Sequence, residues 1–117
     1  MAKVQLQPGP ETHLPLTATV LSILLALAGG EKHGYAIMKE SAAQAPSTKM
    51  GPGTLYGSLD RMVAAGLAEE TGTTDDERRR YYRITRAGRE ALAQEATRLR
   101  SALSALRRKG VHPEVTT

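Results

Sequence analysis

The chain contains no cysteine, phenylalanine or tryptophan. Without cysteine it can form neither a disulfide nor a cysteine-ligated zinc or iron–sulfur site, and nothing indicates an oxidising compartment. The longest apolar run, 20–28, is interrupted by Ser22 and is far shorter than the roughly 20 residues of a membrane-spanning helix. The polar first residues do not resemble a secretion signal. These absences predict a cytoplasmic protein with no membrane role.

Aromatic residues are almost absent too, because the 117 residues include only four tyrosines, at positions 35, 56, 81 and 82. Leucine, isoleucine, valine, methionine and alanine must therefore supply the buried volume, and aliphatic cores of this kind suit helices. Hydrophobic residues make up 40% and charged residues 24% of the chain, as in folded globular proteins. The length allows one domain and at most one further element.

Apolar spacing and turn residues predict four helices and one β-hairpin. The first helix begins at Leu14, has Pro15 in its first turn and ends at Gly29 and Gly30. The second runs over about 33–43, and the third starts in the turn 51–54 and stops at Gly66. Strands at 67–71 and 81–85 flank a long polar tip, and a helix capped by Thr85 follows from 86 to about 109. We expect a flexible arm at 1–13, a DNA-binding domain at 14–85, a dimerisation helix at 86–110 and a tail at 111–117.

Three helices followed by a two-stranded wing are the order of a winged helix-turn-helix, a mainly α fold with a small β-hairpin. In that fold the third helix enters the major groove of duplex DNA and the wing lies over the adjacent backbone. If Leu55, Leu59 and Met62 pack inward, the third helix presents hydroxyls and an arginine that can bond to bases or phosphates. The candidates on this helix are Thr54, Tyr56, Ser58 and Arg61.

A net charge of +4 and a sequence pI near 9.7 permit nucleic-acid binding. Six arginines fall within residues 78–89, where there is no acidic residue. The first three lie where the wing tip returns to its strand, within reach of a phosphate or the minor groove. Outside the third helix, the predicted DNA contacts are His33 and Tyr35 at the start of the second helix, Lys49 in the connector, and Arg78, Arg79 and Arg80.

The last helix carries apolar residues at steps of 4, 3, 4 and 3, the seam of a coiled coil. A lone helix cannot bury such a seam, and the first helix offers a second apolar face, so we expect a homodimer. The seam could alternatively pack on the chain's own domain. The predicted dimer interface consists of Leu16, Val20, Ile23, Leu24, Leu27, Leu92, Ala96, Leu99, Leu103 and Leu106.

Four segments together resemble the signatures of the PadR family of transcriptional regulators in order and spacing. They are His33-Gly34-Tyr35-Ala36-Ile37, residues 51–56, Gly66-Leu67, and residues 80–85 with Ala87-Gly88. The resemblance covers about residues 16–99, and the single last helix is similar to that of the short-tailed subgroup. It implies a dimeric repressor that releases DNA when a small molecule binds. Two recognition helices related by the two-fold axis of such a dimer would read an inverted-repeat operator. Two glycines, Gly51 and Gly57, stand where the family often has serine and proline.

Other interpretations remain open beside this one. A winged helix can serve protein–protein contact, with the basic wing facing an acidic partner; Tyr56, Tyr81 and Tyr82 can pack inward, and an arginine run can be solvated surface. No catalytic triad, phosphate-binding glycine loop or metal-ligand set occurs, so we expect neither an enzyme nor a metal or cofactor. A small-molecule effector is an open option, and without tryptophan it would be held by aliphatic contacts from the first and last helices.

Overall fold

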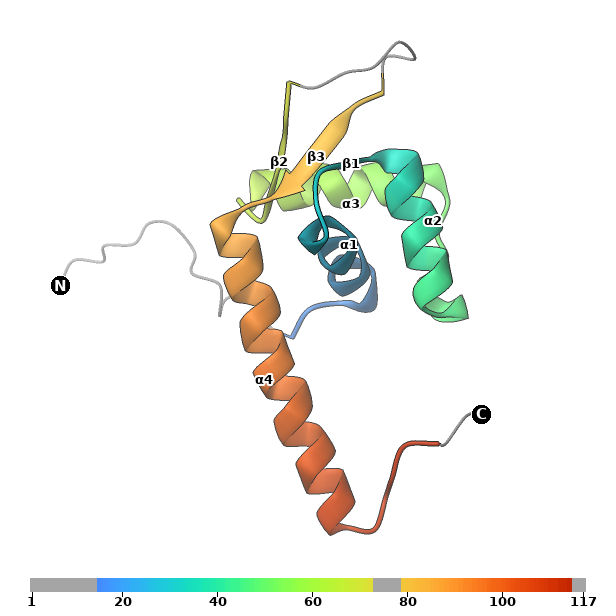
Figure 1. Cartoon of the computed structure of the whole chain (residues 1–117), viewed down its shortest axis with the longest axis vertical. Coiled ribbons are helices and arrows are strands. Elements are labelled where there is room, and N and C mark those ends of the chain that lie inside the picture. Colours follow the sequence, from blue (N-terminus) through green and yellow to red (C-terminus); the bar gives the residue numbers. More distant parts are fainter. Residues whose placement is uncertain (1–14, 73–78, 115–117) are drawn as a thin grey trace, which may run out of the picture.

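The computed structural model describes residues 15–72 and 79–114, and these residues fold into helices and a small antiparallel sheet (Figure 1). The predicted arm 1–13, Arg78 and the last three residues of the tail lie outside the described residues. The expected mainly helical fold with a small sheet is confirmed. In chain order the elements are α1 Ala18–Ala28, β1 Lys32–His33, α2 Gly34–Gln44, the 3-10 helix η2 Pro46–Thr48, α3 Pro52–Ala64, β2 Ala68–Glu70, β3 Tyr81–Ile84 and α4 Arg86–Arg108.

Side-chain caps define where the helices begin. Thr85 accepts a hydrogen bond from the Gly88 N–H at 3.0 Å, which confirms the predicted cap of α4. The predicted start of α1 at Leu14 is wrong, because Thr17 is the cap residue and accepts from the Val20 N–H. Pro15 therefore lies in the segment before the helix and not in its first turn.

The sheet has three strands and not two, in the order β1-β3-β2, with both pairings antiparallel. The central strand β3 pairs with β2 as predicted, and its other edge pairs with the two-residue strand β1. A strand of two residues has no alternation that a sequence pattern could detect. Its consequence is local: it sets His33 opposite Tyr81, the first residue of β3 after the wing tip.

We call the part of the chain from Pro15 to the end of β3 the head. Helix α1 lies in its centre, where it packs against α2, α3 and β3 and also against α4 (Figure 1). Four residues that we assigned to a dimer interface are instead core residues of the chain itself, between 0% and 9% exposed: Leu16, Ile23, Leu24 and Leu27. The assignment was wrong because α1 is surrounded by other elements of its own chain, and its broad apolar stripe packs against them. Val20, from the same set, is half-buried and packs against that core.

Helix α4 has two differently placed halves. Near its start Gly88 and Ala91 are buried against the head, whereas its far half extends beyond the other helices (Figure 1). Of the predicted seam, Leu99 and Leu106 are 44% and 47% exposed, Ala96 is exposed, and Leu92 and Leu103 are half-buried. The seam thus stays open to a partner along most of its length.

Between α1 and α4 runs an apolar groove of about 360 Å³. The α1 side is formed by Leu21 and Leu25. The α4 side is formed by Leu92, Ala93, Glu95, Ala96 and Leu99.

A buried carboxylate ties α4 to the segment that leads into α1. Glu95 is 1% exposed; its Oε1 accepts from the Leu16 N–H at 3.3 Å and from Arg98 Nε at 3.0 Å. The Arg98 guanidinium lowers the pKa of Glu95, helped by the Leu16 N–H and opposed by burial. Because Leu16 belongs to the core of the head, this bond joins the head to the helix that extends from it.

Among the helices of residues 15–72 and 79–114, none has the length and hydropathy to cross a bilayer.

Candidate nucleic-acid interface

Helix α3 presents a face of small residues. Its inner face is formed by four buried residues, Leu55, Ser58, Leu59 and Met62. At 100° per residue, the opposite side of the helix is centred on Gly53, Gly57, Asp60 and Ala64. Three of these are exposed and Gly57 is half-buried. A helix with so little side-chain volume on its outer face can approach base edges closely.

Ser58 does not lie on this outer face, contrary to our prediction. It is 3% exposed, because its position three residues after Leu55 and four before Met62 places it on the inner side. Its Oγ lies 3.4 Å from Arg61 Nη2. Ser58 is therefore withdrawn from the candidate DNA contacts, whereas Thr54 and Arg61 are exposed as expected.

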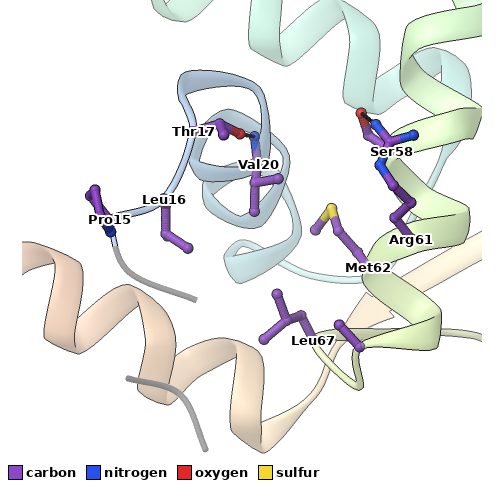
Figure 2. A pocket seen from close by; sticks show the side chains of 9 residues that line it. Pro15, Leu16, Thr17, Val20, Ser58, Arg61, Met62 and Leu67 are labelled. Carbon is purple, nitrogen blue, oxygen red and sulfur yellow. Dashed lines mark hydrogen bonds between the residues drawn. The ribbon is translucent and has the colours of Figure 1, made fainter. Parts of the chain in front are cut away.

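Arg61 stands at the end of a cavity of about 190 Å³ between α3 and the start of α1. Figure 2 shows Leu16 and Val20 facing Met62 and Leu67 across this space, with Arg61 reaching along α3 to Ser58. The guanidinium is accessible, but it flanks the outer face of α3 and does not stand at its centre.

Tyr56 joins α3 to α2. Its ring is half-buried and packs against the core, and a Cβ at Gly34 would lie 2.2 Å from its hydroxyl oxygen. We expected this side chain to point outward; only part of it does. The tyrosine fits against the start of α2 because residue 34 has no side chain.

Arg80 is bound within the protein and does not project freely. Its Nε and Nη2 each donate to the Glu70 carboxylate at 2.9 Å, and Asp60 on α3 lies 4.0 Å away. Its guanidinium carbon lies 5.9 Å from the ring centre of Tyr56 and 5.6 Å from that of Tyr82. The hydrogen bonds raise the pKa of Arg80 and lower the pKa of Glu70. Arg80 thus connects β2, β3 and α3, and any contact that it makes with DNA comes from a fixed position.

The arginine run is partly neutralised by acids that the sequence places elsewhere. Arg83 pairs with Glu69, the residue directly opposite on β2, and Arg86 lies 3.6 Å from Glu90 one turn along α4. Tyr82, next to Arg83 on β3, is fully buried, and burial raises the pKa of its hydroxyl. The surface is therefore less basic than the isolated segment 78–89 suggests.

The start of α2 and the start of β3 form a cluster of aromatic and basic groups around His33. The imidazole Nδ1 caps α2 by accepting from the Ala36 N–H at 3.3 Å, and Nε2 lies 3.0 Å from Arg79 Nη1. Tyr35 stacks on one side of the ring at 6.5 Å, and Tyr81 meets it edge-on at 5.4 Å. Tyr35 is 56% exposed, so the cluster opens to the surface.

These contacts make one surface of three elements that are separate in sequence. Arg80 links the wing to α3, Tyr56 links α3 to α2, and the His33–Arg79 contact links α2 back to the wing. Lys49 is exposed just after η2, before α3 begins. Sequence reasoning missed β1 and the role of the acids of β2. A signal for these acids was available, because Glu69 and Glu70 lie on the strand that was predicted to pair with the one carrying Arg83.

The family model for PadR-like transcriptional regulators matches residues 23–94, more than half of the chain. The chain belongs to the PadR-like family. The matched range contains α2, α3 and the wing, which carry the contiguous surface. As a PadR-like transcriptional regulator the protein is a DNA-binding protein and not an enzyme.

Relatives and solved structures agree with this assignment. The chain is 39% identical over 79 residues to transcriptional regulator Rv3488 of Mycobacterium tuberculosis, covering 67% of this chain and 72% of the relative. It is 44% identical over 77 residues to an uncharacterised 37.1 kDa protein in transposon TN4556 of Streptomyces fradiae. That match covers 63% of this chain but only 21% of the transposon protein.

Among solved structures, RosR of H. salinarum is similar with a TM-score of 0.67 and 28% identity, over 78% of this chain and 80% of that one. A PadR family regulator from Clostridium difficile has a TM-score of 0.70 at 22% identity, over 79% and 97% of the two chains. The second likeness concerns the fold alone. Together they bear out the expected winged helix.

Proposed function

We propose that the protein is a sequence-specific repressor that binds an inverted-repeat operator as a homodimer. The observation that carries this proposal is the contiguous surface of α2, α3 and the wing. A helix with small outer residues beside a wing that bears arginines has the arrangement with which winged helices read a major groove and hold the adjacent backbone. Exposed Thr54 and Arg61 supply donors on the helix itself.

The dimer half of the proposal is supported by the open apolar seam of α4 and the groove beside it. Leu25 is 46% exposed and Leu99 is 44% exposed, on the two sides of this groove. Burying such a strip against a second copy removes apolar surface from water. Two heads related by a two-fold axis would reach successive major grooves about 34 Å apart, which requires an operator with matching half-sites.

The proposal is tested with the DNA upstream of the protein's own gene and a shuffled duplex, titrated at several salt concentrations. We expect preference for the natural sequence and a steep fall of the logarithm of the binding constant with the logarithm of salt concentration. A reporter under that promoter should be repressed. Equal affinity for both duplexes would favour the alternative of a winged-helix protein–protein module.

Dimerisation is tested with Leu99→Glu and a matched control on the opposite side of α4, Ser101→Glu. Sedimentation should give a dimer for the wild type and the control, and a monomer with lost operator binding for Leu99→Glu. A wild-type protein that sediments as a monomer at micromolar concentration contradicts this part of the proposal.

We extend the proposal to an effector that binds in the groove between α1 and α4. The groove walls are aliphatic, and the charged group in them, Glu95, is already bound to Arg98. An apolar molecule fits such walls better than an ionic one. Release of operator DNA by a panel of apolar compounds, with ionic analogues as controls, tests this preference.

A further inference from the structure

The His33 ring is in contact through both of its nitrogens. Nδ1 lies 3.3 Å from the Ala36 nitrogen and accepts a hydrogen bond from its N–H, which caps α2. Nε2 lies 3.0 Å from Nη1 of Arg79. Each distance is that of a hydrogen bond.

A count of protons shows that the ring cannot accept in both contacts. A neutral imidazole has one accepting and one donating nitrogen, whereas a guanidinium and a backbone N–H only donate. In either neutral tautomer one contact therefore joins two donors, and a protonated ring makes both contacts donor to donor. The tautomer that keeps the cap of α2 turns an Nε2–H toward the N–H of Arg79.

An oxygen with a negative charge between the two groups resolves this conflict. Such an oxygen has the lone pairs to accept from His33 Nε2–H and from Arg79 together, and the long arginine side chain can move to admit it. We propose that His33 and Arg79 together bind one phosphate of the DNA backbone. This inference depends on the proposed function, since the phosphate belongs to the duplex that α3 reads.

The surroundings of the pair suit a backbone phosphate. Tyr81 edge-on and Tyr35 in parallel hold the plane of the His33 ring, so that Nε2 has a set direction. Lys39 lies 5.6 Å from the centre of the Tyr35 ring and adds positive charge at the exposed side. The site lies where α2 meets the wing, and both elements belong to the contiguous surface that contains α3.

Two substitutions separate the binding role of His33 from its capping role. His33→Asn keeps an oxygen that can cap α2 but has no donor at the position of Nε2, whereas His33→Ala loses both. We expect H33N to melt like the wild type and to bind the upstream duplex about tenfold more weakly, the scale of a hydrogen bond to a charged group. H33A should both melt earlier and bind more weakly.

Arg79→Gln completes a double-mutant cycle. It should weaken binding and reduce the salt slope by about one, since one charged phosphate contact is lost. If both residues hold the same phosphate, adding H33N to R79Q should weaken binding by less than about twofold further. The inference would be overturned if the losses of affinity in H33N and R79Q multiply in the double variant. It would also be overturned if a folded H33N binds the duplex with the affinity of the wild type.

The ring itself can be observed by nitrogen NMR, which also decides the matter should H33N fail to fold. Addition of one equivalent of duplex should shift Nε2 and leave Nδ1 unprotonated. Inorganic phosphate should need millimolar concentration for the same shift. An equal response to both at low concentration would identify a general anion site and refute the DNA-specific assignment.

These results are separable from failure of the proposed function. If the wild type binds no duplex, the proposed function is wrong. If it binds with a steep salt slope and the cycle shows no coupling, only the phosphate assignment is wrong.

Discussion

Replacement of Gly88 by alanine tests how tightly α4 is joined to the head. Glycine inside a helix normally costs about 0.5–1 kcal/mol relative to alanine, so propensity alone predicts that Gly88→Ala stabilises the protein. The packing predicts the opposite. A Cβ on residue 88 would lie 2.2 Å from the carbonyl oxygen of Leu67 and 2.7 Å from Cγ1 of Ile84.

The size of the effect follows from what must move. Carbon and oxygen atoms in contact lie about 3.3 Å or more apart, so α4 and the Leu67 backbone must separate by roughly 1 Å. The same Leu67 oxygen accepts from the Thr85 N–H at 3.1 Å, so the separation also strains that hydrogen bond. Overpacking of about 1–3 kcal/mol and a weakened bond of about 1 kcal/mol, less the helical gain, leave a net loss of about 2 kcal/mol.

Thermal melting at matched protein concentration measures this loss. A loss of about 2 kcal/mol corresponds to a decrease in Tm of about 10 °C for a domain of this size. The matched control is Gly57→Ala in α3, where a Cβ would meet only Arg61 Nη1 at an ordinary 3.7 Å and should raise stability. If Gly88→Ala melts at or above the wild type, the close contact at Leu67 is wrong.

Three further predictions concern the site. Gly34→Ala should displace the Tyr56 ring and weaken operator binding several-fold, and the same substitution in a Tyr56→Leu background should have little further effect. Asp60→Ala removes an exposed carboxylate from the outer face of α3 and should tighten binding to shuffled DNA several-fold by removing repulsion; unchanged shuffled-DNA affinity would contradict it. Glu95→Gln should destabilise the protein at pH 7, because Arg98 and the Leu16 N–H lower the folded pKa of Glu95. Denaturant titrations should show the full difference in free energy of unfolding between wild type and variant above the ordinary glutamate pKa near 4.5. The difference should disappear as the pH falls through the lowered pKa of Glu95 in the folded protein. A constant difference down to pH 2 would contradict the prediction.

Much of the backbone was predictable because its signals are local. The cap at Thr85 and the stop at Gly66 each act within a few residues, and Gly66 has the positive φ of 81° that glycine allows. The start of α1 was wrong for a local reason as well, since Thr17 competes with Leu14 as the first position and has the capping oxygen. Local chemistry thus decides where elements begin and end.

Side-chain roles were harder to predict because they depend on residues far apart in sequence. From sequence, the apolar stripe of α1 could pack either within its own chain or against a partner chain. Only the packing of α2, α3 and α4 around α1 shows that it packs within its own chain. Glu70 binds Arg80 across ten residues, so an arginine run looked more basic than the folded surface is. Ser58 is the exception, since its spacing from Leu55 and Met62 already placed it inside.

The internal bonds of the head bear on how the proposed dimer would respond to the proposed effector. Arg80 joins the wing to α3 through Glu70 and Asp60, and these contacts favour one arrangement of the two elements in the absence of DNA. Glu95 joins the head to α4 through the Leu16 backbone. In the proposed dimer, a molecule in the groove beside Glu95 would then change the angle between the two heads. The shape of each head would stay the same. We therefore expect a lost Glu95 link to weaken binding to an operator with two half-sites while leaving affinity for a single half-site unchanged; equal losses on both duplexes would show that the heads themselves deform.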